Sequence, residues 1–351
     1  MYRHNIWKLA EYGNLLNVPL NQWPFNLHPP VQTLFEQLNI ISQHLINYTG
    51  IFNTFPEIHC NITPLELHPY IDLYPIDINR RLLFIGTFPP FSYIHQNLNN
   101  TGLERLMNIY NRPIENIIPW FLYFYGSDNS LWRYLPGIEN VEQLDVNFIQ
   151  NWNLIYDVSF TDIIRSCQRS RFQSTDDKDL YNIIFNSKVF ESLLNPKSNI
   201  DKLYFTSGKW QAQILNGNAK LNALKLFLKA SMEAGIMVNV ASWNQPEQMH
   251  FLEVHDELLD GKALFCLKLN ERIFKVICLP SPSGSASRRI KSHPFFRGWL
   301  HFYNPEIFQL IEDGALIAEV APGLTDIFRR QIYEIAINQD FETLSIFQDF
   351  P

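Results

Sequence analysis

The sequence predicts an α/β protein of three layers (α/β/α), in which helices cover both faces of a short central parallel sheet of about four strands. Three observations predict this class. Hydrophobic residues make up 46% of the 351 residues, which is enough for a large core. Four short runs of β-branched, aromatic and other apolar residues each end at a turn-forming residue. The stretches between these runs are long enough for crossover helices.

The four predicted strands cover residues 82–85, 203–206, 237–241 and 274–279, and they are followed by Gly86, Ser207, Ser242 and Pro280. The clearest crossover helix is predicted over 211–234. Sheets of this kind bind ligands at the carboxyl ends of their strands. A binding site is therefore expected among the loops that follow these strands.

Helical extensions are predicted on both sides of the α/β part. Apolar residues at helical spacing over 31–45 predict an N-terminal helix, and amphipathic segments over 306–313 and 325–338 predict two C-terminal ones. The predicted domains are a mostly helical N-terminal extension over 1–78, an α/β domain over 79–304 and an acidic helical tail over 305–351.

Composition excludes several classes of protein. No signal peptide and no apolar segment of membrane-spanning length is recognisable, so a cytoplasmic protein that does not enter a membrane is expected. The four cysteines fit no common zinc or iron–sulfur spacing, which predicts reduced thiols and no metal site. A phosphate-binding P-loop is not expected either, because Leu203 stands where its first glycine should be.

The net charge of −7 is unevenly distributed. Nine acidic and two basic residues over 306–351 account for all of it, so the rest of the chain is neutral. The stretch 272–305 holds six basic residues and no acid. Such a stretch suits phosphate contacts, and it is equally typical of a solvated basic face.

Four loop motifs occur in order between about residues 80 and 295. The first runs from Gly86 to Pro90 after a strand, and the second runs from Phe124 to Trp132 and joins aromatic residues to Asn129. The third covers 157–169, and the fourth covers 279–285 after the last strand. Together they resemble the motifs of the uracil-DNA glycosylase superfamily, and are most similar to its hypoxanthine-DNA glycosylase and mismatch-specific uracil glycosylase branch.

The resemblance implies a monofunctional DNA glycosylase that needs no cofactor and no metal. Such an enzyme hydrolyses the N-glycosidic bond of an extruded base and leaves an abasic site. DNA is the implied partner, and a monomer is implied. The substrate stays open between uracil or hypoxanthine, in DNA repair, and hypermodified cytosine of phage DNA, in antiviral defence.

The resemblance carries the catalytic role onto Asn129, with Asp128 as a charged alternative. Both are also common turn residues. Most of the superfamily has a water-positioning residue in the first motif and a histidine in the last, whereas this chain has Phe88 and Leu279.

Base and phosphate contacts are expected from the same motifs. The base-binding candidates are Gly86, Thr87, Phe88, Phe124, Tyr125 and Asp162. Phe124 or Tyr125 would stack on the base, unless both are core aromatics. Asp162 is also a third candidate for orienting water, unless it is a helix cap. The DNA-binding candidates are Ser281, Ser283, Gly284, Ser285, Arg288, Arg289 and Lys291, in a loop that is otherwise a Ser/Gly turn.

Two other functions stay open. One is a catalytically silent nucleic-acid-binding module, which Phe88 and Leu279 favour. The other is an α/β hydrolase with Ser281 or Ser283 as its nucleophile, although the G-x-S-x-G elbow of that class is absent.

Overall fold

The computed structural model describes residues 66–68, 71, 74–88, 131–139, 146–170, 177–209, 221–252, 260–283, 290–315 and 323–350. These residues fall into two compact units. The first contains the described parts of Met1–Pro75, Phe88–Gly126 and Ile164–Asn186, and the second those of Ile76–Thr87, Ser127–Ile163 and Ser187–Pro351. The second unit thus includes the described residues on both sides of position 305.

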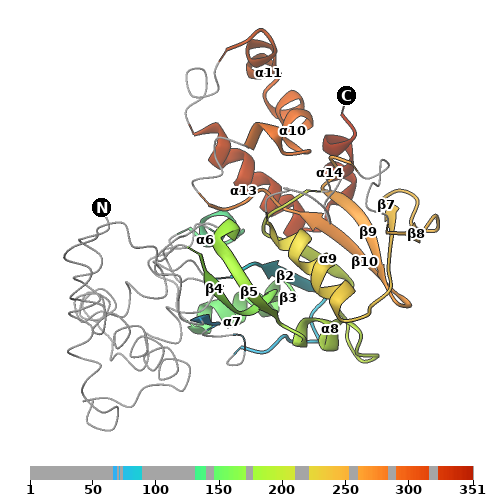
Figure 1. The fold of residues 1–351 in the computed structure, drawn as a ribbon. Coiled ribbons are helices and arrows are strands. Elements are labelled where there is room, and N and C mark those ends of the chain that lie inside the picture. The colour runs from blue at the N-terminus through green and yellow to red at the C-terminus, as the bar shows by residue number, and fades with distance from the viewer. Residues whose placement is uncertain are drawn as a thin grey trace, which may run out of the picture. The chain divides into compact units, whose positions relative to one another are not determined.

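A seven-stranded sheet forms the centre of the second unit (Figure 1). In sheet order its strands are β3 (Val158–Asp162), β2 (Leu82–Gly86), β6 (Lys202–Phe205), β10 (Arg272–Cys278), β9 (Leu264–Leu269), β7 (Val238–Ser242) and β8 (His250–Phe251). The first four are parallel to one another, and β9, β7 and β8 extend the sheet in antiparallel pairs. The predicted α/β class with a parallel centre is confirmed.

The sheet has more strands than the four predicted, and a hairpin is the reason. Leu269 of β9 pairs with Arg272 of β10 across a tight turn, in which Asn270 has a φ of 52°. Because β9 lies between β7 and β10 and is antiparallel to both, the runs 237–241 and 274–279 are not neighbouring parallel strands. The first of these runs therefore forms β7, in the antiparallel part, and β3 is the fourth parallel strand.

Helices cover both faces of the parallel strands. The described helices of the second unit are α6 (Leu131–Tyr134), α7 (Val146–Ile155), α8 (Lys188–Leu193), α9 (Ala223–Glu233), α10 (Phe296–Tyr303), α11 (Pro305–Glu312), α13 (Leu324–Ile337) and α14 (Phe341–Gln348). The predicted segments 306–313 and 325–338 correspond to α11 and α13. None of the described helices is long and apolar enough to cross a membrane.

Successive residues of one strand contact opposite faces of the sheet, because their side chains point in opposite directions. Phe205 of β6 packs on Phe227 of α9, with ring centroids 5.2 Å apart, and Phe190 of α8 packs on the same ring. Tyr204 faces the other way and donates its hydroxyl to the carbonyl of Ala336 in α13 at 2.6 Å. The second unit is therefore a three-layer α/β/α arrangement, with α9 along one face of the sheet (Figure 1).

An aromatic cluster fills the α13 side of β2 and β3. Phe84 stacks on Phe160 at 5.0 Å, and Phe160 also meets Trp132 of α6 at 5.5 Å and Trp152 of α7 at 6.2 Å. Trp132 is fully buried. Because burial of an aromatic side chain of this size stabilises a fold by roughly 2–3 kcal/mol, these contacts anchor α6 to the sheet.

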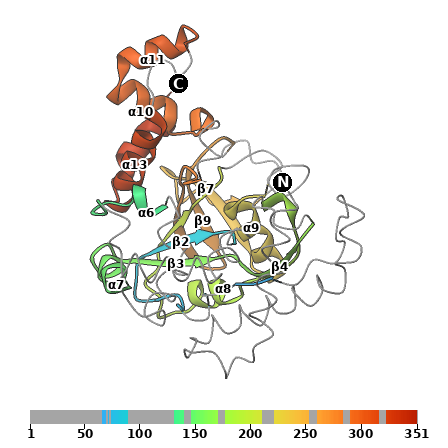
Figure 2. The same cartoon turned by 90° about the vertical axis from the view of Figure 1, so that its left-hand side faces the viewer.

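The acidic C-terminal residues pack as part of the second unit. Figure 2 shows α13 reaching from the sheet to α10 and α11. A Cβ at Gly298 of α10 would collide with the backbone of Phe347 in α14, so these helices pack closely only because residue 298 is glycine. The Gln348 side chain accepts from the backbone N–H groups of Ala263 and Leu264, both at 2.7 Å, which holds α14 on β9.

The first unit contains a small antiparallel sheet in the order β1 (Glu66–Leu67), β4 (Ile164–Arg169), β5 (Leu180–Phe185). The motif over 157–169 is therefore divided, because β3 belongs to the second unit and β4 to the first. The predicted helix over 31–45 lies outside the described residues, and so does the part of the predicted crossover helix before position 221.

Candidate functional site

Predicted site residues lie where the parallel strands end. β3 ends at Asp162, β2 ends at Gly86, Thr206 follows β6, and residues 279–283 follow β10. All four strands run in the same direction, so these positions share one edge of the sheet. Adjacent strands are about 4.8 Å apart, which separates the ends of β3 and β10 by about 14 Å.

Gly86 and Asp162 face each other at this edge. Their Cα atoms are partners in the register of β2 and β3, and the N–H of Ile163 donates to the carbonyl of Gly86 at 3.0 Å. The Oδ1 atom of Asp162 fills the space that a Cβ at position 86 would need, and Thr206 Oγ1 is 3.7 Å from that place. Only glycine at position 86 lets this fully buried carboxylate lie against the backbone of β2.

The two residues after Gly86 differ in their surroundings. Thr87 is half-buried at the end of β2. Phe88 belongs to the first unit, is only 3% exposed, and places its ring edge-on to that of His68 at 5.6 Å. The structure thus brings Gly86, Thr87 and Asp162 to one edge in the second unit, whereas the described contact of Phe88 is with His68 in the first.

Side chains of α13 hold the loop after β10 through hydrogen bonds to its backbone carbonyls. The guanidinium of Arg329 donates from Nε to the carbonyl of Ser281 at 2.9 Å and from Nη2 to that of Ser283 at 3.2 Å. The Tyr333 hydroxyl donates to the carbonyl of Pro280 at 3.1 Å. Three backbone carbonyls of this loop, those of Pro280, Ser281 and Ser283, thus point towards α13. As residues, Ser283 is exposed and Ser281 is half-buried.

Arg329 also links this loop to α6. Its Nη1 atom lies 3.0 Å from Asp326 Oδ1, and the hydroxyl of Tyr134 in α6 donates to the same oxygen at 2.9 Å. Burial, together with the hydrogen bond to Asp326, raises the pKa of Tyr134 above its ordinary value. The tyrosine therefore remains a hydrogen-bond donor at neutral pH.

Two lysines lie close to the same loops. Lys209 follows β6, and its ammonium donates to the carbonyl of Ser292 at 3.2 Å. Lys291, adjacent to Ser292, is exposed. This edge of the sheet therefore carries positive charge next to the serine loop.

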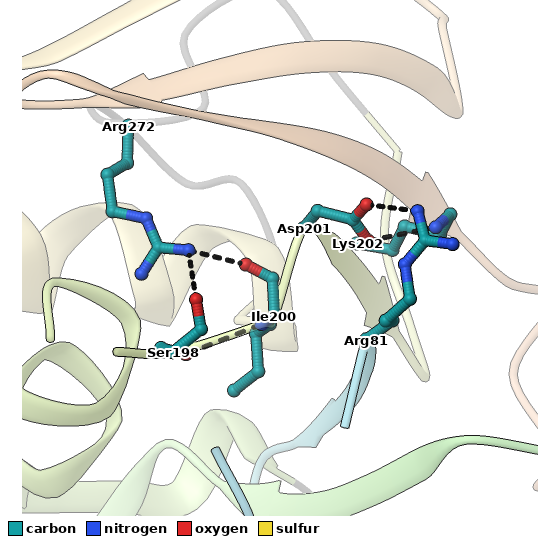
Figure 3. Close-up of polar contacts among 6 residues, drawn as sticks. All are labelled: Arg81, Ser198, Ile200, Asp201, Lys202 and Arg272. Atoms are coloured by element: carbon teal, nitrogen blue, oxygen red, sulfur yellow. Dashed lines mark hydrogen bonds and ion pairs between the residues drawn. The ribbon is translucent and has the colours of Figure 1, made fainter. Parts of the chain in front are cut away.

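The described basic residues of the stretch 272–305 do not all lie at the same end of the strands. Arg272 lies at the opposite, amino end of the strands, where its guanidinium donates to the carbonyls of Leu193, Asn195, Ser198 and Ile200 at 2.5–3.0 Å. Figure 3 shows the bonds to Ser198 and Ile200. Arg297 pairs with Glu312 at 2.9 Å. The expectation of phosphate contacts is wrong for Arg272, because main-chain carbonyls take up its donors.

The other predicted residues lie outside the described part of the chain. They are Asp128, Asn129, Phe124, Tyr125, Gly284, Ser285, Arg288 and Arg289. In the sequence, α6 begins two residues after Asn129.

Sequence reasoning missed Arg329, and a signal for it was present. Arg329, Tyr333 and Ala336 recur at the helical spacing of one face, and that face is the buried side of α13. An arginine within an apolar stripe indicates a partner inside the protein, since a buried guanidinium must be hydrogen-bonded.

His293 also has an unpredicted role at this edge. Its Nε2 atom lies 3.1 Å from the carbonyl of Cys278, and its Nδ1 atom accepts from the N–H of Phe295 at 3.3 Å. Burial lowers the pKa of His293 to about 3 despite the bond to Cys278. The ring is therefore neutral at physiological pH, with its proton on Nε2, and it supports the end of β10.

The arrangement combines a buried hydrogen-bond acceptor, an anchored serine loop and two lysines along one sheet edge. Within the described ranges, no three His, Cys, Asp or Glu side chains come together as a metal site. Comparisons of the chain with protein-family models, with curated proteins and with solved structures gave no match. The chemistry of the site is therefore interpreted from its own residues.

Proposed function

We propose that this chain is a monofunctional DNA glycosylase, which hydrolyses the N-glycosidic bond of an extruded base and leaves an abasic site. One observation carries the proposal: a buried carboxylate ends β3, and an anchored serine loop follows β10, about 14 Å away along the same edge. A base-excising enzyme must read the edge of the base at one place and hold phosphates at another. An extruded nucleotide with its neighbouring phosphates spans such a separation.

The β3 end suits the base. We assign the carboxylate oxygens of Asp162 the role of hydrogen-bond acceptors, which would select a base edge that presents N–H groups. Cytosine offers its N4 amino group, and uracil and hypoxanthine offer a ring N–H. Because Asp162 is removed from water, a hydrogen bond that it accepts there is stronger than in solvent.

The β10 end suits phosphates. Its carbonyls point towards α13. We assign the contacts with the DNA backbone to the side chains of Ser281 and Ser283 in this loop. Lys291 and Lys209 add the charge that phosphate binding requires.

The reaction needs a group that orients water at the anomeric carbon. We assign this role to Asn129, with Asp128 as the alternative, since both precede the anchored helix α6 in the sequence. A water oxygen bonds to C1′ while the bond from C1′ to the base breaks, and the base leaves with the electron pair. One proton passes from the water, through solvent, to the departing base.

The test is abasic-site formation on a panel of DNAs: uracil-containing, hypoxanthine-containing, unmodified, and phage DNA with hydroxymethylated or glucosylated cytosine. Alkali-labile breaks on at least one modified DNA, lost in Asn129→Ala with DNA binding nearly intact, are expected. If Asn129→Ala keeps the wild-type rate and Asp128→Ala does not, the role moves by one residue. Breaks on uracil or hypoxanthine DNA indicate repair, and breaks confined to phage DNA indicate defence. No breaks on any DNA would contradict the proposal.

A catalytically silent nucleic-acid-binding module is the second candidate. It is favoured because Phe88 and Leu279, which stand where most of the superfamily has a water-positioning residue and a histidine, are both buried apolar side chains. That function predicts DNA binding without any alkali-labile break.

A further inference from the structure

We infer that Thr206 is a specificity-determining residue of the base site, whose hydroxyl donates to an acceptor atom of the base beside the N–H group that Asp162 accepts. Because Thr206 lies on the phosphate side of Asp162, the pair selects a pyrimidine over hypoxanthine. The inference rests on the proposed function, which assigns the base to the end of β3 and the phosphates to the loop after β10.

Thr206 lies in the same row of the sheet as Asp162. Asp162 and Gly86 are register partners at the ends of β3 and β2. Ile85 pairs with Phe205 of β6, so Thr206 continues the row on the next strand. The main-chain N–H of Thr206 donates to the carbonyl of Ile85 at 3.1 Å, which fixes the backbone at this position. Three neighbouring strands thus end at one level.

The Thr206 side chain points to the α13 face of the sheet. Its neighbour Ser207 accepts from the N–H of Ala223 in α9 at 3.2 Å, whereas Tyr204, two residues before Thr206, bonds to α13. Since successive side chains alternate between the faces, Thr206 shares the face of Tyr204. The loop after β10 is bonded to α13 as well. Thr206 and this loop therefore lie on the same side of the sheet.

The glycine at position 86 lets two polar side chains approach each other. A Cβ at Gly86 would collide with Oδ1 of Asp162, and Thr206 Oγ1 lies 3.7 Å from the same place. Both oxygens thus flank the backbone of one glycine, and they are close enough to bind neighbouring atoms of a single base. Thr206 is β-branched, which restricts its χ1 rotation and holds the hydroxyl in this place.

The two side chains offer different hydrogen-bonding groups. The carboxylate of Asp162 is assigned as an acceptor, whereas a threonine hydroxyl carries a proton that it donates. Together they match a base edge on which an N–H group and an acceptor atom are neighbours. Asp162 is fully buried and Thr206 is half-buried, so both hydrogen bonds are stronger than they would be in water.

The order of the two groups along the sheet edge decides which bases fit. β6 lies between β2 and β10, so Thr206 is nearer than Asp162 to the loop that is assigned to the phosphates. The sugar joins the base to the phosphates. The acceptor atom that Thr206 contacts should therefore lie on the sugar side of the N–H group that Asp162 contacts.

Pyrimidines have an acceptor at that position and hypoxanthine does not. Uracil carries O2 on the sugar side of its N3–H group, and cytosine carries N3 on the sugar side of its N4 amino group. Hypoxanthine carries a C–H group on the sugar side of N1–H, because its O6 acceptor lies on the far side. The site is thus expected to take uracil or a modified cytosine.

The test compares single-turnover base release by wild type, Thr206→Val and Thr206→Ser. The DNAs share one sequence and carry uracil, hydroxymethylcytosine or hypoxanthine. Wild type should release a pyrimidine faster than hypoxanthine. Thr206→Val keeps the shape but loses the hydroxyl, so it should lower the pyrimidine rate roughly five- to tenfold and the hypoxanthine rate less than about twofold. Thr206→Ser should restore the pyrimidine rate to within about twofold of wild type.

Ser207→Ala is the matched control, because it removes a neighbouring hydroxyl on the α9 face. It should lower the unfolding temperature by about 2–4 °C and leave the ratio of pyrimidine to hypoxanthine release unchanged. Faster release of hypoxanthine than of either pyrimidine by wild type overturns the inference. Equal losses on both kinds of base in Thr206→Val, or an equal change of the ratio in Ser207→Ala, also overturn it.

Binding separates this inference from the proposed function. Kd values for single-stranded DNA that carries one of the same bases are measured with wild type and Thr206→Val. A preference for a pyrimidine that Thr206→Val loses, without base release on any DNA, contradicts the proposed function and leaves the reading of the base by Thr206 standing. Equal Kd values for all bases, together with no release, overturn both.

Discussion

The two ends of the parallel strands use their charged residues in opposite ways. At the amino ends, Arg272 gives its donors to four main-chain carbonyls, and Asp201 holds two cations (Figure 3). At the carboxyl ends, Lys291 is exposed beside a loop whose carbonyls point inward. The difference teaches that basic residues in a sequence indicate phosphate contacts only when main-chain carbonyls do not engage them.

Asp201 and its two cations, Arg81 and Lys202, are a second example of charged residues that bind each other at the amino ends. Arg81 lies 2.6 Å and Lys202 lies 2.8 Å from the two carboxylate oxygens. Burial acts to raise the pKa of Asp201, but the hydrogen bonds from Lys202 and Arg81 lower it below its ordinary value. The carboxylate is therefore ionised at neutral pH and joins the starts of β2 and β6.

The largest expected effect is at the amino ends. Arg272→Met leaves four carbonyls without their donor and should lower the free energy of unfolding by roughly 3–5 kcal/mol, measured by urea denaturation. Lys268→Met, which breaks the exposed pair with Glu271, should cost less than about 1 kcal/mol. An Arg272→Met protein of wild-type stability that binds DNA more weakly would contradict the comparison.

At the carboxyl ends, Gly86→Ala should act on both stability and activity. The added Cβ meets the Asp162 carboxylate, which should cost roughly 2–3 kcal/mol of stability and abolish base release. Asp162→Ala in the same chain removes the collision, so the double variant should recover most of the unfolding temperature but not the activity. Recovery of base release in the double variant would remove Asp162 from the site.

A smaller effect is expected for Lys291→Ala. Loss of one phosphate contact should weaken DNA binding several-fold for every sequence and reduce the salt slope by about 1. Lys268→Ala is the matched control, because that lysine lies towards the amino end of β10, where it is opposite Ile273. Equal salt slopes for the two variants would show that the carboxyl edge is not where the backbone of DNA binds.

A further prediction concerns pH. His293 has a pKa of about 3 in the folded protein and about 6.5 when unfolded, so the unfolded chain binds more protons between these values. Its contribution to stability is complete above pH 6.5 and is lost as the pH falls, by roughly 1 kcal/mol per pH unit. Urea denaturation at pH 7, 6 and 5 should show a shallower loss in His293→Gln than in wild type. An unchanged slope would mean that the ring titrates normally in the folded protein.

Much of the fold was predictable because apolar runs mark buried strands. The runs 82–85, 203–206 and 274–279 correspond to the parallel strands β2, β6 and β10. β3 escaped prediction because Ser159 and Thr161 interrupt its apolar residues, although both are buried. The Ser159 hydroxyl accepts from the N–H of Asp77 at 3.0 Å, a partner 82 residues away that no local pattern reveals.

The sequence allowed prediction of those site residues that lie at the last position of a strand. Gly86 and Asp162 come together because each closes one of two paired strands. The contacts of Arg329 with residues 46 and 48 positions earlier arise only when α13 packs on the sheet, and sequence spacing cannot show them. Likewise, the engagement of Arg272 by carbonyls depends on the turns between α8 and β6.

The most direct test of the account is mass spectrometry of what the wild-type protein and Asp162→Ala release from the DNA that is cleaved in the panel. A base-excising site at the carboxyl edge predicts intact free base from the wild type and none from Asp162→Ala, with the sugar–phosphate chain unbroken before alkali. Release of nucleotides, or equal release of free base by the two proteins, would contradict it.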